Sequence, residues 1–141
     1  MSEHVPRLVA FYEALTEQTL PQLHDLYAKN AYFKDPFNEV RDVAAIEKIF
    51  AHMFVSLNNP RFVVHTKIVD GNEAFLAWDF KFHMKKFRPD IEQTIRGSSH
   101  LKFDVTNRVV FHRDYWDAAE ELYEKLPLLG GFMRFLKKLV G

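Results

Sequence analysis

Residues 61–84 decide the fold, and they read RFVVHTKIVDGNEAFLAWDFKFHM. In the second half of this stretch, apolar side chains occupy every second position: Ala74, Leu76, Trp78, Phe80, Phe82 and Met84. A period of two is typical of a strand with one buried face. Asp70-Gly71-Asn72 separates the two halves and is a hairpin signal. The stretch therefore predicts two antiparallel strands that form one wall of a core.

The segments on either side extend this pattern. Downstream, residues 91–103 and 109–115 also alternate, with a turn at Thr106-Asn107 between them. Upstream, apolar spacing predicts helices over 4–17, 20–28 and 42–57, and residues 31–37 predict a brief strand ended by Pro36. Asp42 occupies a capping position for the third helix. We expect one domain over residues 1–141, a cone-shaped α+β barrel with three N-terminal helices packed in a curved antiparallel sheet.

The composition excludes several classes of function. Lys and Arg together number 19, as do Asp and Glu, so no surface field of one sign favours nucleic-acid binding. The absence of cysteine excludes disulfides and thiol nucleophiles. The sequence shows neither a signal-peptide pattern nor a long apolar run, so we expect a cytoplasmic protein without a membrane span. Aromatic residues make up 15% of the chain, enough to line a pocket or a dimer face in addition to a core.

Asp35 is the first candidate for chemistry. It lies between Tyr32-Phe33 and Pro36-Phe37, apolar surroundings that raise the pKa of a carboxyl toward the range of a general base. The alternative is an Asp-Pro turn with a solvated side chain.

The segment VVFHRDYWD, residues 109–117, supplies a second set of ionisable groups. Alternation divides it into two faces, Val110, His112, Asp114 and Trp116 against Val109, Phe111, Arg113 and Tyr115. If the first face looks inward, His112 and Asp114 both reach one ligand. The alternative is a cross-strand ion pair on the surface of the sheet.

The remaining motifs indicate no cofactor. The seven histidines lack metal-ligand spacing and there is no glycine-rich phosphate loop, so we expect neither a metal nor a nucleotide. The residues 97–100, GSSH, lie within a predicted strand and indicate a place where another group approaches closely. Residues 126–141 predict a basic amphipathic extension, with a helix at 132–140 that caps the domain or docks on a partner subunit. Lying on a membrane is the alternative for this helix.

Two longer stretches carry a family resemblance: LYAKNAYFKDPFNEVRDVAAIEKIF at 26–50 and GSSHLKFDVTNRVVFHRDYWD at 97–117. Over residues 4–126 the chain resembles the nuclear-transport-factor-2-like superfamily of cystatin-like folds, in particular its SnoaL-like and ketosteroid-isomerase-like branch. The resemblance implies the cone fold, an internal pocket and dimerisation through the outer face of the sheet. It implies no single reaction, because the superfamily includes isomerases, polyketide cyclases, epoxide hydrolases, dehydratases and non-catalytic proteins.

Compared with ketosteroid isomerases, the chain keeps the base and lacks the oxyanion hole. Asp35 falls where that family keeps its proton-shuttling aspartate. Phe11 falls at the position of the oxyanion-hole tyrosine, with Tyr12 beside it, and Ser99 falls at the position of the protonated aspartic acid. The resemblance therefore supports a base at Asp35 without supporting steroid isomerisation.

The ending HRDYWD also resembles limonene-epoxide-hydrolase-like proteins, with Asp114 at the position of a catalytic aspartate. Trp78 and Phe80 replace the Arg and Asp that work with it, so epoxide hydrolysis is the less favoured function.

Our leading hypothesis is a SnoaL-like protein that binds a small apolar, cyclic metabolite in an aromatic pocket. If it is an enzyme, the chemistry is cofactor-free acid/base catalysis of the isomerase, cyclase or dehydratase type, with Asp35 as base and His112 with Asp114 as proton donor or orienter. The alternative is a non-catalytic ligand-binding or dimerisation module. The expected ligand-binding residues are Tyr12, Phe33, Phe50, Phe54, Trp78, Phe80, Ser99 and Trp116. We expect a homodimer formed through the outward Phe75, Ala77, Phe111 and Tyr115.

Overall fold

The computed structural model describes residues 3–117 and 120–121. Its helices are α1 (His4–Glu13), the 3-10 helix η1 (Leu20–Gln22), α2 (Leu23–Leu26) and α3 (Val43–Ser56). Its strands are β1 (Tyr27–Lys34), β2 (Glu39–Val40), β3 (Asn58–Asp70), β4 (Glu73–His83), β5 (Glu92–Phe103) and β6 (Val109–Tyr115). These strands form one sheet in the order β2-β1-β6-β5-β4-β3.

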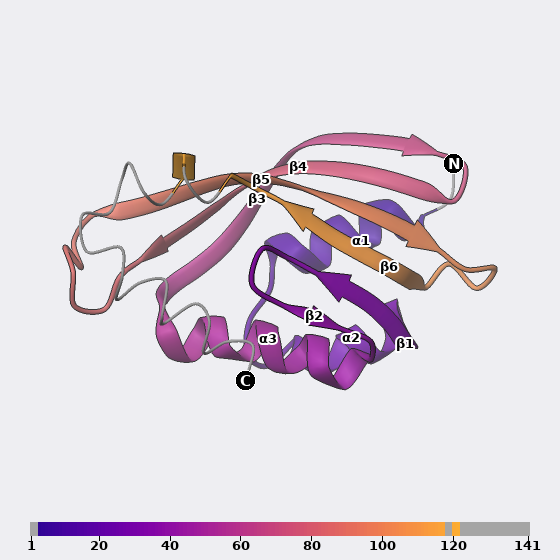
Figure 1. Cartoon of the computed structure of the whole chain (residues 1–141), viewed down its shortest axis with the longest axis horizontal. Helices are drawn as coiled ribbons and strands as arrows, with labels where there is room; N and C mark the ends of the chain where they lie inside the picture. The colour runs from indigo at the N-terminus through magenta and orange to yellow at the C-terminus, as the bar shows by residue number, and fades with distance from the viewer. Residues whose placement is uncertain (1–2, 118–119, 122–141) are drawn as a thin grey trace.

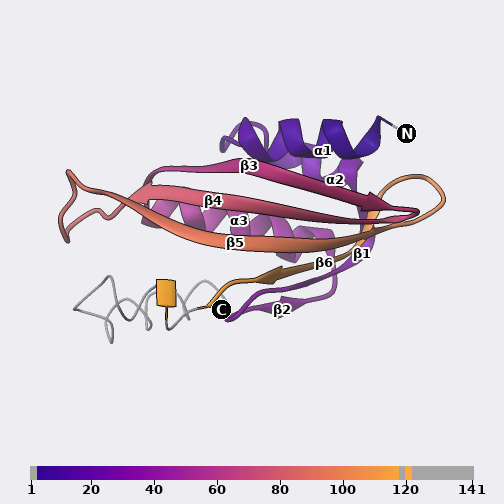
Figure 2. The same cartoon turned by 90° about the horizontal axis from the view of Figure 1, so that it is seen from above.

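The sheet curves over the helices and does not close. The long strands β3 to β6 arch across the top of Figure 1, with α1 and α3 on the same side beneath them. In Figure 2 the helix α1 runs along the β3 edge of the sheet, while α3 lies behind the long strands. The α+β fold class, with three helices in a curved sheet, is thus confirmed.

The hairpin predicted at Asp70-Gly71-Asn72 is present. β3 and β4 pair from Asp70↔Glu73 outward, and Gly71 takes a φ of +60° in the turn, which glycine adopts without steric cost. On β4 the buried residues are the predicted alternate ones, Ala74, Leu76, Trp78, Phe80 and Phe82.

One pair of strands departs from the predicted antiparallel sheet. β1 and β6 run parallel, with Phe33 opposite His112. The chain between them contains α3 and the whole β3–β5 meander, and a long connection of this kind is what parallel pairing requires. The short strand β2, which pairs with the other edge of β1, was not predicted.

Two predicted helices end early because other groups compete for their backbone. The first ends at Glu13 and not at residue 17, since Thr16 and Thr19 bond each other's backbone and hydroxyl groups in a tight turn. The second, predicted over 20–28, becomes η1 and α2 and ends at Leu26, because Tyr27 already pairs with Val109 in the sheet.

Helix α3 begins as predicted. The Asp42 carboxylate accepts a hydrogen bond of 2.7 Å from the backbone N–H of Ala45, which satisfies one free donor of the first turn. Val43, Ile46, Ile49 and Phe50 form its buried face.

A bulge in β6 moves Val109 to the other face of the sheet from the one that alternation predicts. Val109 was predicted on the outer face with Phe111, but it is fully buried. Val109 pairs with Phe103 and Phe111 with the next residue, Lys102, so Val110 is an extra residue that resets the alternation. Beyond the bulge the predicted faces hold, with His112 buried and Tyr115 exposed.

The predicted extension at 126–141 lies outside the described residues. Among the described helices, none has the length and apolar character needed to cross a membrane.

Candidate functional site

A small cavity lies between the helices and the sheet. Its walls come from six elements, and the lining side chains are Tyr12, Phe50, Phe62, Val64, Trp78, Ser99, His112 and Asp114. Its volume is about 20 Å³, enough for one water molecule. Most of the wall is apolar, and the polar atoms gather where β4, β5 and β6 meet.

Those polar atoms belong to a continuous set of hydrogen bonds, here called the buried network: Trp78, Ser99, Asp114, His112, Tyr27 and Tyr12. The indole Nε1–H of Trp78 donates to Ser99 Oγ at 2.9 Å, and Ser99 donates to Asp114 Oδ1 at 2.5 Å. His112 Nε2 lies 2.7 Å from the same oxygen. Trp78, Ser99 and Asp114 come from the successive strands β4, β5 and β6, so the register of the sheet brings this half of the network together.

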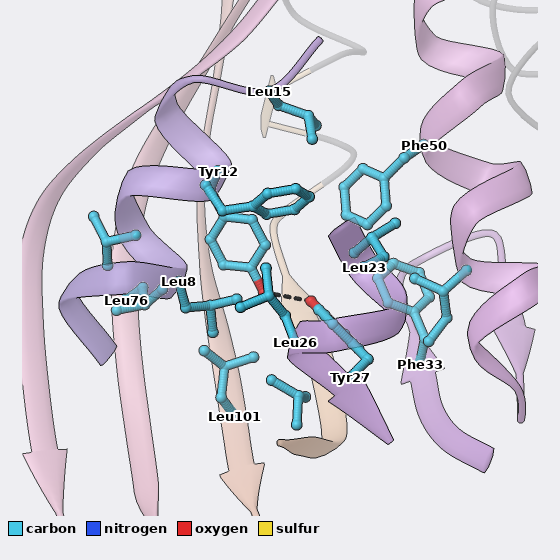
Figure 3. Close-up of a cluster of buried hydrophobic side chains, with 14 of the residues drawn as sticks. Leu8, Tyr12, Leu15, Leu23, Leu26, Tyr27, Phe33, Phe50, Leu76 and Leu101 are labelled. Atoms are coloured by element: carbon cyan, nitrogen blue, oxygen red, sulfur yellow. Dashed lines mark hydrogen bonds between the residues drawn. The ribbon is translucent and has the colours of Figure 1, made fainter. Parts of the chain in front are cut away.

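The other half of the buried network runs toward the helices. His112 Nδ1 lies 2.7 Å from the hydroxyl of Tyr27 at the start of β1, and that hydroxyl bonds the hydroxyl of Tyr12 on α1. Figure 3 shows the two phenol groups meeting between Leu8 and Leu26, with Phe33 and Phe50 on the other side. Both ring nitrogens of His112 are therefore engaged, and only 3% of its surface is exposed.

Burial sets the charge states at the tyrosine end. It raises the pKa of Tyr12 and of Tyr27 far above the usual value of 10.0, because a phenolate would lose its hydration in this apolar environment. The charge of Asp114 raises both values further. Both groups thus remain neutral phenols, able to donate as well as to accept.

Both bonds to the Asp114 carboxylate end on Oδ1, from Ser99 and from His112. Within the described residues, Oδ2 accepts no hydrogen bond. The Asp114 side chain is 16% exposed and lines both the cavity and a second, open pocket on the outside of the molecule.

Trp78 is held in place by a close approach to β5. A Cβ added to Gly97 would lie 2.5 Å from the indole Cη2, so only glycine leaves room for the ring. This contact explains the glycine of GSSH, where a close approach was predicted. Phe62 packs edge-on against the same indole, with ring centroids 5.4 Å apart.

Asp35 lies beside this site in a tight turn. Its carboxylate accepts backbone bonds from Phe37 and Asn38, at 2.8 and 2.6 Å, and the Asn38 amide donates to both oxygens at 3.0 Å. Burial raises the pKa of Asp35, the Asn38 amide partly offsets this, and the charge of Asp114 adds to the rise. The residue thus combines the features of both readings, a turn former and a carboxyl in apolar surroundings.

Asp35 and Asp114 share the open pocket but not the cavity. Asp35 lines the open pocket together with Asp114 and Trp116 and does not line the cavity. Trp116 packs against Phe37, with ring centroids 5.6 Å apart.

Of the other residues named from sequence, six line the cavity: Tyr12, Phe50, Trp78, Ser99, His112 and Asp114. Phe33 packs behind His112, with ring centroids 4.8 Å apart, and Phe80 packs behind Phe62 at a tilt of 32°. Phe54 is half-buried on α3 and does not line the cavity.

Sequence reasoning missed three residues of this site, Tyr27, Phe62 and Val64. Phe62 and Val64 share one parity on β3, but Val63 between them is also apolar, so alternation does not single them out. Tyr27 carried no such signal, because its role depends on a partner 85 residues away.

The outer face of the sheet carries a row of stacked rings. Phe75 stacks on His100 at 4.4 Å, His100 contacts Phe111 at 5.4 Å, and Phe111 stacks on Tyr32 at 5.3 Å. Phe75 is 44% exposed, whereas the His100 side chain is only 19% exposed. Phe111 and Tyr32 are half-buried, so the row is open to solvent mainly at Phe75. In the described part of the chain, no three His, Cys, Asp or Glu side chains lie close enough to hold a metal.

Solved structures share this architecture at low sequence identity. A nuclear-transport-factor-2-like protein of unknown function from Burkholderia pseudomallei has a TM-score of 0.73 and 17% identity, over 87% of this chain and 97% of that one. A candidate SnoaL-like polyketide cyclase from Shewanella putrefaciens also has a TM-score of 0.73, with 20% identity over 91% of this chain and 98% of that one. An LEH-like epoxide hydrolase from M. tuberculosis has a TM-score of 0.71 and 14% identity, over 94% and 95%.

At these identities the neighbours establish the fold alone. Among curated proteins, none matches the sequence significantly. The SnoaL-like domain model matches residues 8–123, which include every element from β1 to β6 and all residues of the buried network. The superfamily resemblance is confirmed, and the chain belongs to the SnoaL-like domain family.

Proposed function

We propose that the protein binds a small apolar, ring-containing molecule at the cavity and exchanges a proton with it through Asp114. The observation that carries this proposal is the buried network, which holds a carboxylate and an imidazole at the wall of an apolar cavity. Apolar side chains of similar volume would stabilise a core at least as well as such a pair. Acid and base groups kept at an internal cavity are typical of functional sites.

The geometry assigns different roles to the two members of the pair. Asp114 Oδ2 is the atom that takes a proton from the ligand or returns it. His112 orients the carboxylate, because both of its nitrogens are bonded within the protein. This arrangement suits isomerisation, cyclisation or dehydration, in which one proton leaves a carbon and another arrives elsewhere.

Asp35 is our proposal for a second base, at the outer side of Asp114. Its raised pKa favours proton uptake, while its bonds to Asn38 hold it in place. Parallel Asp35→Asn and Asp114→Asn variants separate the two assignments.

Ligand entry requires the rim of the cavity to move. The present volume of about 20 Å³ admits no ring. Phe62 and Val64 on the edge strand β3 line the cavity and are only half-buried, so they are the side chains that a ring would displace.

The binding test uses a panel of five- and six-membered ring molecules with one polar atom each, followed by amide chemical shifts of the labelled protein. We expect shift changes around Ser99 and Asp114 for some members of the panel. Val64→Trp fills the cavity and should abolish them. Val63→Trp, at the neighbouring position that is 40% exposed, is the matched control and should leave them intact. Equal binding to both variants, or no binding by any ring, would refute the proposal.

The proton-transfer test follows hydrogen exchange of cyclopentanone in D₂O. Asp114 removes a proton from the carbon beside the carbonyl, the C–H electron pair enters the enolate, and a deuteron returns to that carbon. We expect exchange in the wild type to exceed the solvent rate, and Asp114→Asn to reduce it by at least about 100-fold. If binding occurs with exchange at the solvent rate, the protein is a binding module without catalysis.

The outer face favours a second role, self-association. We propose that two copies pair through the aromatic row of Phe75, His100, Phe111 and Tyr32, because the exposed ring of Phe75 continues into half-buried rings and so offers apolar area to an interface. Sedimentation should show a dimer that Phe75→Lys weakens. Val105→Lys, at a fully exposed turn position, is the control. A wild type that is monomeric at micromolar concentration would exclude this role.

A further inference from the structure

The two oxygens of the Asp35 carboxylate differ in the number of donors that they face. Oδ1 accepts from the backbone N–H groups of Phe37 and Asn38, at 2.8 and 2.6 Å, and from the Asn38 amide at 3.0 Å. Within the described residues, Oδ2 accepts only from the same amide, also at 3.0 Å. Each oxygen of an ionised carboxylate has about two lone-pair sites, so Oδ1 is fully occupied and Oδ2 keeps one site open. Oδ2 is therefore the oxygen at which Asp35 can take up a proton.

The Asn38 side chain bonds Asp35 and leaves one of its own atoms unpaired. Asn38 is 4% exposed, and its Nδ2 donates to both carboxylate oxygens. Its Oδ1 is buried and has no hydrogen-bond partner among the described residues. An unpaired buried acceptor destabilises a fold, so its presence needs an explanation. Turning the amide over would bring Oδ1 against the carboxylate, where two acceptors would face each other. The charge of Asp35 thus holds the amide in this orientation.

The turn at Asp35 closes without this amide. The backbone N–H of Asp35 donates to the Asn38 carbonyl at 2.9 Å, and Asp35 Oδ1 accepts from the two backbone N–H groups. A turn of this kind is built by the aspartate side chain and the backbone. What the Asn38 amide adds is the bond to Oδ2 and a further bond to Oδ1, and both of these act on the carboxylate.

Burial and the Asn38 amide act in opposite directions on Asp35. Burial raises the pKa of the Asp35 carboxyl because a buried charge loses its hydration, and the charge of Asp114 raises it too. The Asn38 amide is the strongest of the groups that lower this pKa, since it donates to the ionised form, and the backbone N–H groups of Phe37 and Asn38 act in the same direction. The other charged or titratable side chains at the open pocket are Lys34 from β1 and Arg113 and Tyr115 from β6. Glu39 from β2 bonds the Tyr32 hydroxyl.

We propose that Asn38 is the positioning residue of Asp35, which holds the carboxylate in its ionised form and leaves Oδ2 as the single oxygen that accepts a proton from a molecule in the open pocket. The inference rests on the proposed function only in taking Asp35 as the second base. It adds the oxygen that reacts and the residue that prepares it. The open pocket has a volume of about 240 Å³ and suits a molecule that presents a C–H, N–H or O–H proton to Oδ2.

The first test needs no ligand. Full-length protein labelled with ¹³C at the aspartate carboxyl carbons and ¹⁵N at the asparagine amides is titrated from about pH 3 to pH 8, where carboxyl groups change charge. We expect the Asn38 amide signals to shift with the same midpoint as the Asp35 carboxyl signal. In Asn38→Leu the Asp35 midpoint should move to higher pH, because burial is then less opposed. Asn72→Leu removes an amide that bonds the Phe103 carbonyl in the β3–β4 turn, and this matched control should leave the Asp35 midpoint unchanged.

Two results would overturn the inference. One is a wild-type Asn38 amide that does not follow the titration of Asp35, and this result needs no variant. The other is an unchanged Asp35 midpoint in Asn38→Leu, which with a lower Tm would show that Asn38 is structural only. If Asn38→Leu does not fold, Asn38→Ser keeps a shorter O–H donor, and it should move the Asp35 midpoint in the same direction by less.

The second test asks whether Oδ2 takes part in proton transfer, with cyclopentanone in D₂O. Asp35 removes a proton from the carbon beside the carbonyl, the C–H electron pair enters the enolate, and a deuteron returns to that carbon. The part of the exchange rate that Asp35→Asn removes should rise with pH around the Asp35 midpoint. Asn38→Leu should move this pH profile to higher pH by the same interval as the carboxyl signal.

The outcomes separate this inference from the proposed function. A rate profile that stays in place while the carboxyl midpoint moves would overturn the assignment of Oδ2 as the acceptor. Exchange at the solvent rate in the wild type would refute the proposed proton transfer, whereas the titration would still decide whether Asn38 holds the Asp35 carboxylate in its ionised form.

Discussion

Replacing Gly97 by alanine tests how the indole of Trp78 is held at the cavity. The new methyl carbon would lie 2.5 Å from Cη2, 2.8 Å from Cζ3 and 2.9 Å from Cζ2 of the ring. Ordinary carbon contacts are about 3.5–4.0 Å, so the overlap is roughly 1 Å. The backbone cannot recede, because Gly97 pairs directly with Trp78 in the β4–β5 ladder. The ring cannot turn freely either, since its Nε1–H bonds Ser99.

The expected cost follows from these contacts. Overpacking of a well-packed core costs about 1–3 kcal/mol. Alanine recovers about 0.4–1 kcal/mol by restricting the unfolded chain. We therefore expect Gly97→Ala to lower the free energy of unfolding by about 1–2 kcal/mol, which corresponds to a Tm lower by roughly 3–8 °C.

The assay is urea unfolding followed by circular dichroism, in the wild type and in a Trp78→Leu background. Without the ring the overlap disappears, so Gly97→Ala should be neutral or slightly stabilising there. The double-mutant cycle should then give a coupling of about 1–2 kcal/mol. An equal cost in both backgrounds would show that the indole does not require this glycine.

Three further perturbations have defined outcomes. Asp42→Ala should lower the free energy of unfolding by about 1 kcal/mol through loss of the α3 cap, while Asp42→Asn should nearly retain it, as measured by urea unfolding. Burial raises the pKa of Asp35 above its usual 3.8, so the folded carboxyl binds a proton more tightly than the unfolded one, and the stability that this contributes below pH 3.8 is lost as the pH rises. The free energy of unfolding of the wild type should therefore fall relative to that of Asp35→Asn over this pH rise. Parallel curves of unfolding free energy against pH for the two proteins would contradict this prediction. Glu121→Ala removes the acceptor for the Arg96 backbone N–H and guanidinium and should cost about 1–2 kcal/mol in the same unfolding assay, whereas an unchanged midpoint would show that this contact does not stabilise the fold.

The sequence predicted best where side-chain alternation alone decides the structure. The buried face of β4 follows from a period of two. In β6 the same period put His112 and Asp114 on one face, and the structure shows that this face lines the cavity. The capped start of α3 followed from one local contact, that of Asp42 with Ala45.

The sequence failed where the outcome depends on competition or on distant partners. The end of α1 was set by Thr16 and Thr19, whose hydroxyls offer the backbone an alternative to the helix. The parallel β1–β6 pair and the role of Tyr27 both arise from contacts that no local pattern encodes. Asp35 remained ambiguous because an Asp-Pro turn and a buried base need the same residues, and in the structure the carboxylate has features of both.

The parallel pairing of β1 with β6 has a consequence for how the protein folds during its synthesis. Tyr27 and His112, which meet across these two strands, are 85 residues apart, and such contacts form late because closing a long loop costs entropy. At a synthesis rate of about 5–20 residues per second, β1 leaves the ribosome roughly 4–15 s before β6. Throughout that interval one edge of β1 has no strand beside it, and the imidazole and carboxylate of the site do not yet exist. Among the described strands, β6 is the last to be made, and it supplies both the partner of β1 and the His112 and Asp114 side chains of the site.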